Sequence, residues 1–182
     1  MKHALVVGGT GMLSGVSQWL VSAGYHVSII ARSAERMNEL VKRVSNSERV
    51  TPLLVDYKDD LLLRMKIKEA IHQNGPIGTV VAWIHSDAVS ALPLLLQEVS
   101  MDYDNWELYH VLGSQANAEE VKRSLIVPAN CLYSQVQLGF VLDNGHPRWL
   151  TNQEISDGVL DAIRQRTERM TVGQVEPHTD WQ

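Results

Sequence analysis

The sequence has one cysteine, no long apolar run and no excess of positive charge. Because Cys131 is the only cysteine among 182 residues, an intramolecular disulfide and a cysteine-built zinc site are excluded. No apolar run approaches the roughly 18 residues that span a bilayer, and no basic leader precedes the apolar segment that begins at Ala4. The net charge of -5 argues against nucleic acid and anionic membrane surfaces as partners. We therefore expect a soluble, cytoplasmic protein.

Metal chemistry and cysteine chemistry also find no support in the sequence. The seven histidines are scattered, and no two form an H-x-x-x-H pair on an expected helix. Cys131 stands between Pro128 and an apolar run that begins near Leu132, where a buried thiol is inert. No repeat, low-complexity tract or proline-rich linker divides the chain, and 182 residues suit one α/β domain over residues 1–182. We expect neither a metal cofactor nor a cysteine nucleophile.

A glycine-rich turn follows the first apolar segment, which has the pattern of a buried strand. Glycines there let a pyrophosphate approach backbone N–H groups at a helix N-terminus. The spacing fits G-x-G-x-x-G from Gly9 or G-x-x-G from Gly8, with Ser14 at the third glycine position and Gly15 one residue late. A tight strand-to-helix turn that uses glycine for geometry alone is the alternative. The predicted phosphate-binding residues are Gly8, Gly9, Thr10, Gly11, Met12, Leu13 and Ser14.

The second expected strand ends in a basic residue. A dinucleotide-binding fold that selects NAD(H) places a carboxylate here to hold the ribose 2′-hydroxyl, but this chain has Arg32-Ser33 and no carboxylate before Glu35. A guanidinium suits a 2′-phosphate, so the sequence favours NADP(H) over NAD(H). The alternative is that Arg32 is a solvated side chain at the start of the next helix.

Strand and helix patterns alternate along the whole chain. Strand patterns cover residues 4–7, 25–31, 49–55, 78–84, 106–112, 133–143 and 170–175, and helical patterns cover 16–23, 34–44, 59–73, 88–99, 117–125 and 151–167. Thr151 and Glu154 form a capping box at the start of the last helix. Nearly apolar strands separated by helical crossovers predict an α/β fold: a doubly wound, mostly parallel sheet of about seven strands with helices on both faces.

In four places the sequence resembles the short-chain dehydrogenase/reductase family, and the resemblance covers most of the chain. The matching segments are the Gly8–Gly15 turn, Arg32-Ser33, Val55-Asp56 at the third strand end and Ile84-His85-Ser86 at the fourth. The resemblance implies a sheet that binds NAD(H) or NADP(H), with the third-strand aspartate at the adenine. Asp56 and Tyr57 would then line the adenine site, and Ile84 would lie beside the cofactor.

The chain departs from this family where the family's chemistry is carried out. Its reductases and dehydrogenases normally have Tyr-x-x-x-Lys with a serine upstream, and no Tyr-x-x-x-Lys occurs in this sequence. Ser114 stands where the serine is expected, but residues 115–125 contain no tyrosine. The lysine of that pair lowers the pKa of the tyrosine and anchors the nicotinamide ribose, so its absence removes the usual proton donor.

Three residues are candidates to replace that donor. Ser114 would point toward the nicotinamide end of the cofactor-binding cleft, unless it caps the next helix. His85 directly follows the fourth strand and titrates near neutral pH, with Asp87 or another carboxylate to orient it, unless it is a structural histidine. Tyr133 could supply a phenol from the sixth strand, although packing is the more common role of such a residue. The predicted catalytic residues are Ser114, His85 and Tyr133.

The sequence leaves three functions open. The first is an NADP(H)-dependent oxidoreductase acting on a small carbonyl or quinoid substrate. The second is a nucleotide-binding protein that senses or stores the cofactor without turnover. The third is a methyltransferase-like protein that binds S-adenosylmethionine, which expects an acidic residue where Arg32 stands. The polar loop 143–149 suits either a surface turn or a segment over the substrate, and a homodimer is expected.

Overall fold

The computed structural model of the protein describes residues 1–101 and 104–175. The strands are β1 (His3–Val7), β2 (His26–Ala31), β3 (Val50–Leu54), β4 (Thr79–Trp83), β5 (Trp106–Leu112), β6 (Cys131–Leu138), β7 (Phe140–Asp143), β8 (His146–Trp149) and β9 (Arg169–Val172). The helices are α1 (Ser14–Ser22), α2 (Ala34–Arg43), α3 (Asp60–Asn74), α4 (Ala91–Ser100), α5 (Ala118–Ser124) and α6 (Asn152–Gln165), with a short 3-10 turn at Ser47–Arg49.

Seven of these strands form one parallel sheet in the order β3-β2-β1-β4-β5-β6-β9. The chain runs outward from β1 to β3 and then returns to β4 on the other side of β1. In an open α/β sheet, ligands bind outside the carboxyl ends of the strands at such a reversal. The predicted doubly wound sheet is therefore confirmed, and the reversal lies between β1 and β4.

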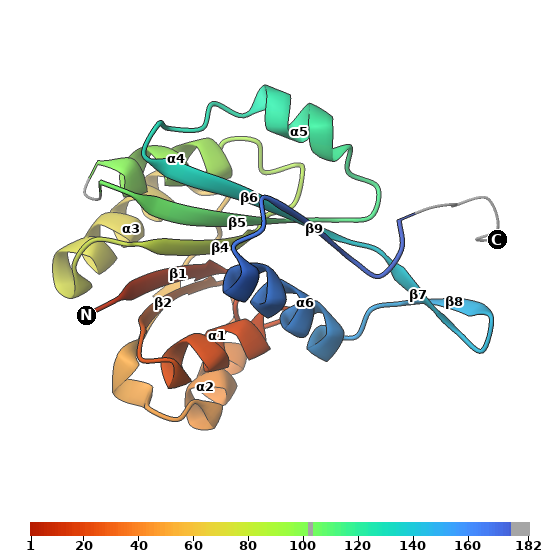
Figure 1. The fold of residues 1–182 in the computed structure, drawn as a ribbon. Helices are drawn as coiled ribbons and strands as arrows, with labels where there is room; N and C mark the ends of the chain where they lie inside the picture. The colour runs from red at the N-terminus through yellow and green to blue at the C-terminus, as the bar shows by residue number, and fades with distance from the viewer. Residues whose placement is uncertain (102–103, 176–182) are drawn as a thin grey trace.

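Helices cover both faces of the sheet, with α1, α2 and α6 on one side and α3, α4 and α5 on the other (Figure 1). Alternate residues of β1 therefore enter two separate cores. Ala4 and Val6 pack toward α1, whereas Leu5 and Val7 pack toward α3 and α4. Burial on both faces explains why the strand sequences are almost continuously apolar rather than alternating.

Most helices begin at the short polar residues that the sequence offers. Side chains of Ser33, Asp59 and Asn117 accept hydrogen bonds from the backbone at the starts of α2, α3 and α5. The predicted capping box at α6 is confirmed, since Thr151 and Glu154 exchange both of its hydrogen bonds. At α1 the N-cap position holds Leu13, which offers no side-chain acceptor.

The single strand predicted over residues 133–143 is wrong. β6 ends at Leu138, and Phe140 then pairs with Gln174 through two backbone hydrogen bonds of 2.9 and 2.8 Å. Gly139 permits this close approach, because a Cβ there would collide with the Gln174 backbone. The chain leaves the sheet as the antiparallel hairpin β7–β8 (Figure 1). Asn144 and Gly145 turn this hairpin with positive φ values of 50° and 79°. The polar segment 143–149 is therefore a two-residue turn followed by β8, rather than an irregular loop.

Within the described ranges, no helix has both the length and the apolar character needed to cross a bilayer.

Candidate functional site

The glycine turn joins β1 to α1 at the carboxyl edge of the sheet, and its three glycines have different surroundings. Gly8 adopts a positive φ of 82°, which favours glycine. A Cβ on Gly9 would lie 2.6 Å from Ser17 Oγ and 2.8 Å from Ile29 Cγ2, so Gly9 lets α1 and β2 pack closely. A Cβ on Gly11 would meet no protein atom within 4 Å. Of the three glycines predicted to give clearance, only Gly11 leaves the Cβ direction open.

The first turn of α1 offers backbone donors to a ligand. The leading N–H groups of a helix have no partner within the helix. At α1 the Ser14 N–H donates to the carbonyl of Gly11 at 3.0 Å, and Leu13 supplies no side-chain cap for the N–H groups that follow. The turn is held in place from α6, because Ser156 Oγ donates a hydrogen bond of 2.9 Å to the carbonyl of Met12. A Cβ on Gly15 would lie 2.8 Å from Ser156 Cβ, so this glycine serves the contact between α1 and α6. The sequence pattern alone does not reveal this role of Ser156.

The ends of β2 and β3 place Arg32 and Asp56 side by side. Arg32 Nη1 lies 4.0 Å from Asp56 Oδ2, and the Arg32 side chain is 75% exposed, so this weak pair leaves the guanidinium free to meet an anion. Ser33 caps α2 by accepting a hydrogen bond of 3.2 Å from the Arg36 backbone, while its hydroxyl hydrogen remains a donor. Asp56 Oδ1 accepts a hydrogen bond of 3.0 Å from the Lys58 backbone.

The loops after β3 and β4 are tied together. The His85 backbone N–H donates a hydrogen bond of 3.3 Å to Tyr57 Oη, and Lys58 Nζ lies 2.6 Å from Asp87 Oδ2. This ion pair lowers the pKa of Asp87. Asp87 therefore binds Lys58, and it makes no hydrogen bond that would orient the His85 ring. The His85 ring instead packs edge-on against the indole of Trp83, with a centroid separation of 5.8 Å.

A cavity of about 270 Å³, here called the crevice, opens at the carboxyl ends of β4, β5 and β6. It is lined by Met12, Trp83, Gly113, Ser114, Leu138, Gly139, Trp149, Leu150 and Ile155. Met12 comes from the glycine turn and Trp149 from the hairpin, so segments far apart in sequence meet there. The Trp83 side chain reaches from the glycine turn to the end of β5, since Cβ atoms added at Gly8 and Gly113 would each lie 3.5 Å from it.

Of the three candidate catalytic residues, Ser114 and His85 lie together and Tyr133 lies elsewhere. Ser114 lies in the crevice and also in an adjoining groove that contains His85. The alternative role for Ser114 as a helix cap is wrong, because Asn117 caps α5. Ser114 Oγ makes no hydrogen bond within the described parts of the chain. Tyr133 lines neither space, and its hydroxyl contacts His110 Nδ1 at 2.9 Å and Gln135 Nε2 at 3.1 Å.

His110 is a site residue that sequence reasoning misses. It is 6% exposed, lies on β5 and lines the groove with Ser114 and His85. A histidine inside an apolar strand is more often structural, as His3 and His26 are here with their bonds to Ser28 and Thr51. The one available signal is the alternation of side chains along the strand: His110 is two residues from Leu108, which packs on the α4 side, so His110 faces that side too.

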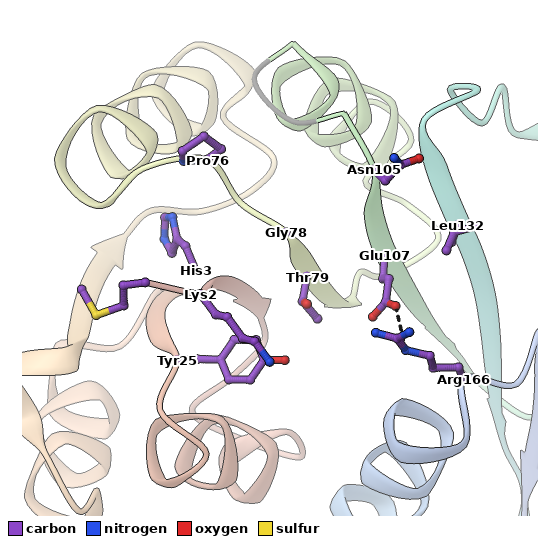
Figure 2. Close-up of a pocket in the computed structure, with 11 residues that line it drawn as sticks. Lys2, His3, Tyr25, Pro76, Gly78, Thr79, Asn105, Glu107, Leu132 and Arg166 are labelled. Carbon is purple, nitrogen blue, oxygen red and sulfur yellow. Dashed lines mark ion pairs between the residues drawn. The ribbon is translucent and has the colours of Figure 1, made fainter.

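A second pocket, of about 330 Å³, lies at the opposite edge of the sheet, where the strands begin (Figure 2). Its charged groups already have partners: Arg166 Nε lies 3.1 Å from Glu107 Oε1, and Lys2 Nζ lies 5.4 Å from the Tyr25 ring centre. None of the predicted site residues lies there. The carboxyl edge is therefore the candidate site.

The described residues contain neither a group of side chains arranged to bind a metal ion nor a reactive thiol. In residues 1–101 and 104–175, no group of three or more histidine, cysteine, aspartate or glutamate side chains is arranged to hold a metal ion. Cys131 is buried, and burial raises the pKa of its thiol to about 12. A thiol with that pKa carries almost no thiolate near neutral pH.

The residues at the carboxyl edge fit a dinucleotide. The uncapped start of α1 and the open Cβ direction of Gly11 leave space and donors for a diphosphate. Arg32 stands two strands from the crevice along the sheet, on the side where an adenosine would extend. The crevice itself has aromatic walls in Trp83 and Trp149, which suit a flat ring.

No protein-family model matches the chain, and no curated protein matches it significantly. Solved structures do match across nearly all of it. A short-chain dehydrogenase/reductase from Brucella melitensis, described as a glucose/ribitol dehydrogenase, has a TM-score of 0.75 at 12% identity, with 97% of each chain covered. A 3-ketoacyl-(acyl-carrier-protein) reductase from the same organism, complexed with NADH, has a TM-score of 0.74 at 12% identity, covering 94% of this chain and 96% of that one.

A blue fluorescent protein from a metagenomic library, in complex with NADPH, has a TM-score of 0.72 at 17% identity, again covering 94% and 96% of the two chains. At these identities the similarity shows a shared fold. The chain has the Rossmann-like fold of short-chain dehydrogenase/reductases, which confirms the expected architecture.

Proposed function

We propose that this chain is an NADP(H)-dependent oxidoreductase of the short-chain dehydrogenase/reductase type, acting on a small carbonyl or quinoid compound. The observation that carries the proposal is the arrangement at the carboxyl edge. The start of α1 at the strand reversal has no side-chain cap, an exposed arginine follows β2, and the serine after β5 lies in the crevice with no hydrogen-bond partner among the described residues. Structural neighbours solved with NADPH and with NADH support a nicotinamide cofactor. The choice of NADP(H) rests on Arg32, because its guanidinium suits a 2′-phosphate.

The chain's own residues would bind and orient the reactants. When bound, the cofactor supplies or accepts a hydride. The glycine turn would hold the diphosphate, and Trp83 and Trp149 would lie beside the nicotinamide ring. Ser114 Oγ, which has no hydrogen-bond partner among the described residues, would donate a hydrogen bond to a substrate oxygen and stabilise the negative charge that develops there on reduction. The proton that this oxygen needs comes from His85 or from water at the open end of the groove, since His85 is exposed.

A non-catalytic NADP(H) sensor is the second candidate. It is favoured by one observation: α5 has seven residues and no tyrosine, and its Lys122 pairs with Glu168. The segment that carries the catalytic tyrosine and lysine in the resembling family therefore holds neither residue in that role.

Turnover separates the two candidates. We expect purified protein to oxidise NADPH with at least one member of a panel of aldehydes, ketones and quinones. Ser114→Ala should lower kcat/KM on the order of a hundredfold without changing NADPH affinity, and exposed Ser47→Ala serves as the control. Tight NADPH binding with no turnover on any acceptor would favour the sensor, and no binding of either nucleotide would reject both.

Three further statements remain predictions from the sequence: a single domain over residues 1–182, a homodimer and a cytoplasmic location. The substrate is proposed only as a class.

A further inference from the structure

A groove of about 670 Å³ lies between α4, β5 and α5, next to the crevice, and is here called the α4–α5 groove. Its size is in the range of small-molecule sites. Its walls are largely apolar, with Leu92, Leu112 and Leu125 among them, and no aspartate, glutamate, lysine or arginine within residues 1–101 and 104–175 lines it. An ionic ligand would lose its hydration there without gaining a countercharge, so the groove suits a neutral compound.

One polar side chain lies deep in this groove. His110 is 6% exposed, and its Nδ1 atom lies 2.9 Å from Tyr133 Oη. Its Nε2 atom has no hydrogen-bond partner in residues 1–101 and 104–175. Because Nδ1 is held by Tyr133, Nε2 is the ring nitrogen left for a ligand.

The hydrogen-bond network determines which nitrogen of His110 carries the proton. Gln135 Nε2 donates to the carbonyl of Ala118 at 2.9 Å, which fixes the orientation of the amide. The same NH₂ group donates to Tyr133 Oη at 3.1 Å. Donation of the single Tyr133 hydroxyl hydrogen to His110 Nδ1 is the arrangement that gives this hydrogen an acceptor, and we assign the 2.9 Å contact in that direction. A neutral ring that accepts at Nδ1 must carry its hydrogen on Nε2.

Both members of this pair stay neutral near pH 7. Burial lowers the pKa of His110 to about 4 and raises the pKa of Tyr133 to about 12. His110 therefore presents an uncharged N–H donor to an uncharged groove.

We propose that the α4–α5 groove binds a neutral, mainly apolar compound and that His110 Nε2–H donates a hydrogen bond to an acceptor oxygen of that compound. His110 is thus a ligand-binding residue, and Tyr133 and Gln135 are positioning residues that fix its tautomer. The identification of this compound as the substrate rests on the proposed function, because the groove shares Trp83, Gly113 and Ser114 with the crevice. Binding in the groove itself is measured without nucleotide, so failure of the two proposals can be distinguished.

The test compares two neutral probes of the same shape, 2-acetonaphthone and 2-isopropenylnaphthalene, which differ in having a carbonyl oxygen or a CH₂ group. We expect the wild-type protein to bind the ketone roughly tenfold more tightly, the preference that one buried hydrogen bond gives. The preference should disappear in His110→Phe, while affinity for the alkene stays unchanged. The control variant His146→Phe, at an exposed position, should keep the preference for the ketone. Anionic 2-naphthoate should bind more weakly than either neutral probe.

A measurement on the wild-type protein covers the case in which His110→Phe does not fold. Long-range ¹H–¹⁵N NMR spectra should show His110 protonated at Nε2 and not at Nδ1, with the Nε2 resonance moving when 2-acetonaphthone is added. The proposal is overturned if NMR shows the proton of His110 on Nδ1, or if neither neutral probe binds. It is also overturned if the wild-type protein binds ketone and alkene equally, or if it binds the naphthoate more tightly than the neutral probes. A preference for the ketone that survives in His110→Phe overturns it as well.

Discussion

At the scale of single residues, His110 makes folding depend on pH. Its pKa of about 4 lies below the value of about 6.5 of a solvated histidine. Between these values the unfolded chain binds more protons than the folded chain, so stability should fall as the pH falls from 6.5 toward 4. From pH 7 to pH 5, this group alone should remove roughly 2 kcal/mol from the free energy of unfolding.

Urea unfolding at the two pH values checks this expectation. His110→Phe should lose roughly 2 kcal/mol less than the wild-type protein between pH 7 and pH 5. His3 and His26, whose pKa values burial also lowers, contribute equally to both proteins. Equal losses in the variant and the wild type would contradict the assigned protonation state.

The position of the glycine turn could be predicted from the sequence, but the role of each glycine could not. An apolar strand pattern followed by glycines and then by a helical pattern is compatible with few structures other than a strand-to-helix turn. The division of roles among the glycines was not predictable. Gly9 and Gly15 are needed because Ser17 and Ser156 approach them from α1 and from α6, and only the folded arrangement places these serines there.

At the scale of elements, helices with polar caps and strands with both faces buried were predictable from the sequence, and the hairpin was not. β6 and β7 are separated by one glycine, and both contain apolar residues at strand spacing, so periodicity does not separate them. The break depends on Gly139 and on its close approach to Gln174, a residue 35 positions later in the sequence. The hairpin matters for the site because its last residue, Trp149, is part of the crevice wall.

α6 packs closely against β9 at Gly158, where there is no room for a larger side chain. A Cβ on Gly158 would lie 2.7 Å from Val172 Cγ1 and closer still to Cγ2. Gly158→Ala should therefore lower the free energy of unfolding by roughly 1–3 kcal/mol, although alanine favours a helix more than glycine does. Asp161→Ala, at an exposed position of the same helix, should change it by less than about 0.5 kcal/mol. An unchanged denaturation midpoint for Gly158→Ala would show that α6 does not pack as described.

At the scale of the whole molecule, the sheet order explains how distant segments form one site. Because the strands are parallel, the segments after β1 to β5 all emerge at one edge, and the reversal between β1 and β4 leaves room for a ligand there. Sequence alone predicted the ends of β1 to β5 to within one residue. It could not predict that Asp87 binds Lys58, or that Tyr133 reaches His110, because these contacts depend on how loops and side chains from different strands meet.

We propose that NADP(H) lies along this edge with its 2′-phosphate at Arg32, and isothermal titration calorimetry with NADPH and NADH is the decisive experiment. The wild-type protein should bind NADPH more tightly than NADH. Arg32→Ala should weaken NADPH binding roughly tenfold to a hundredfold while leaving NADH binding unchanged, and exposed Arg43→Ala should alter neither. Equal affinities of the wild-type protein for the two nucleotides would contradict the role of Arg32, and no heat of binding with either would contradict the site itself.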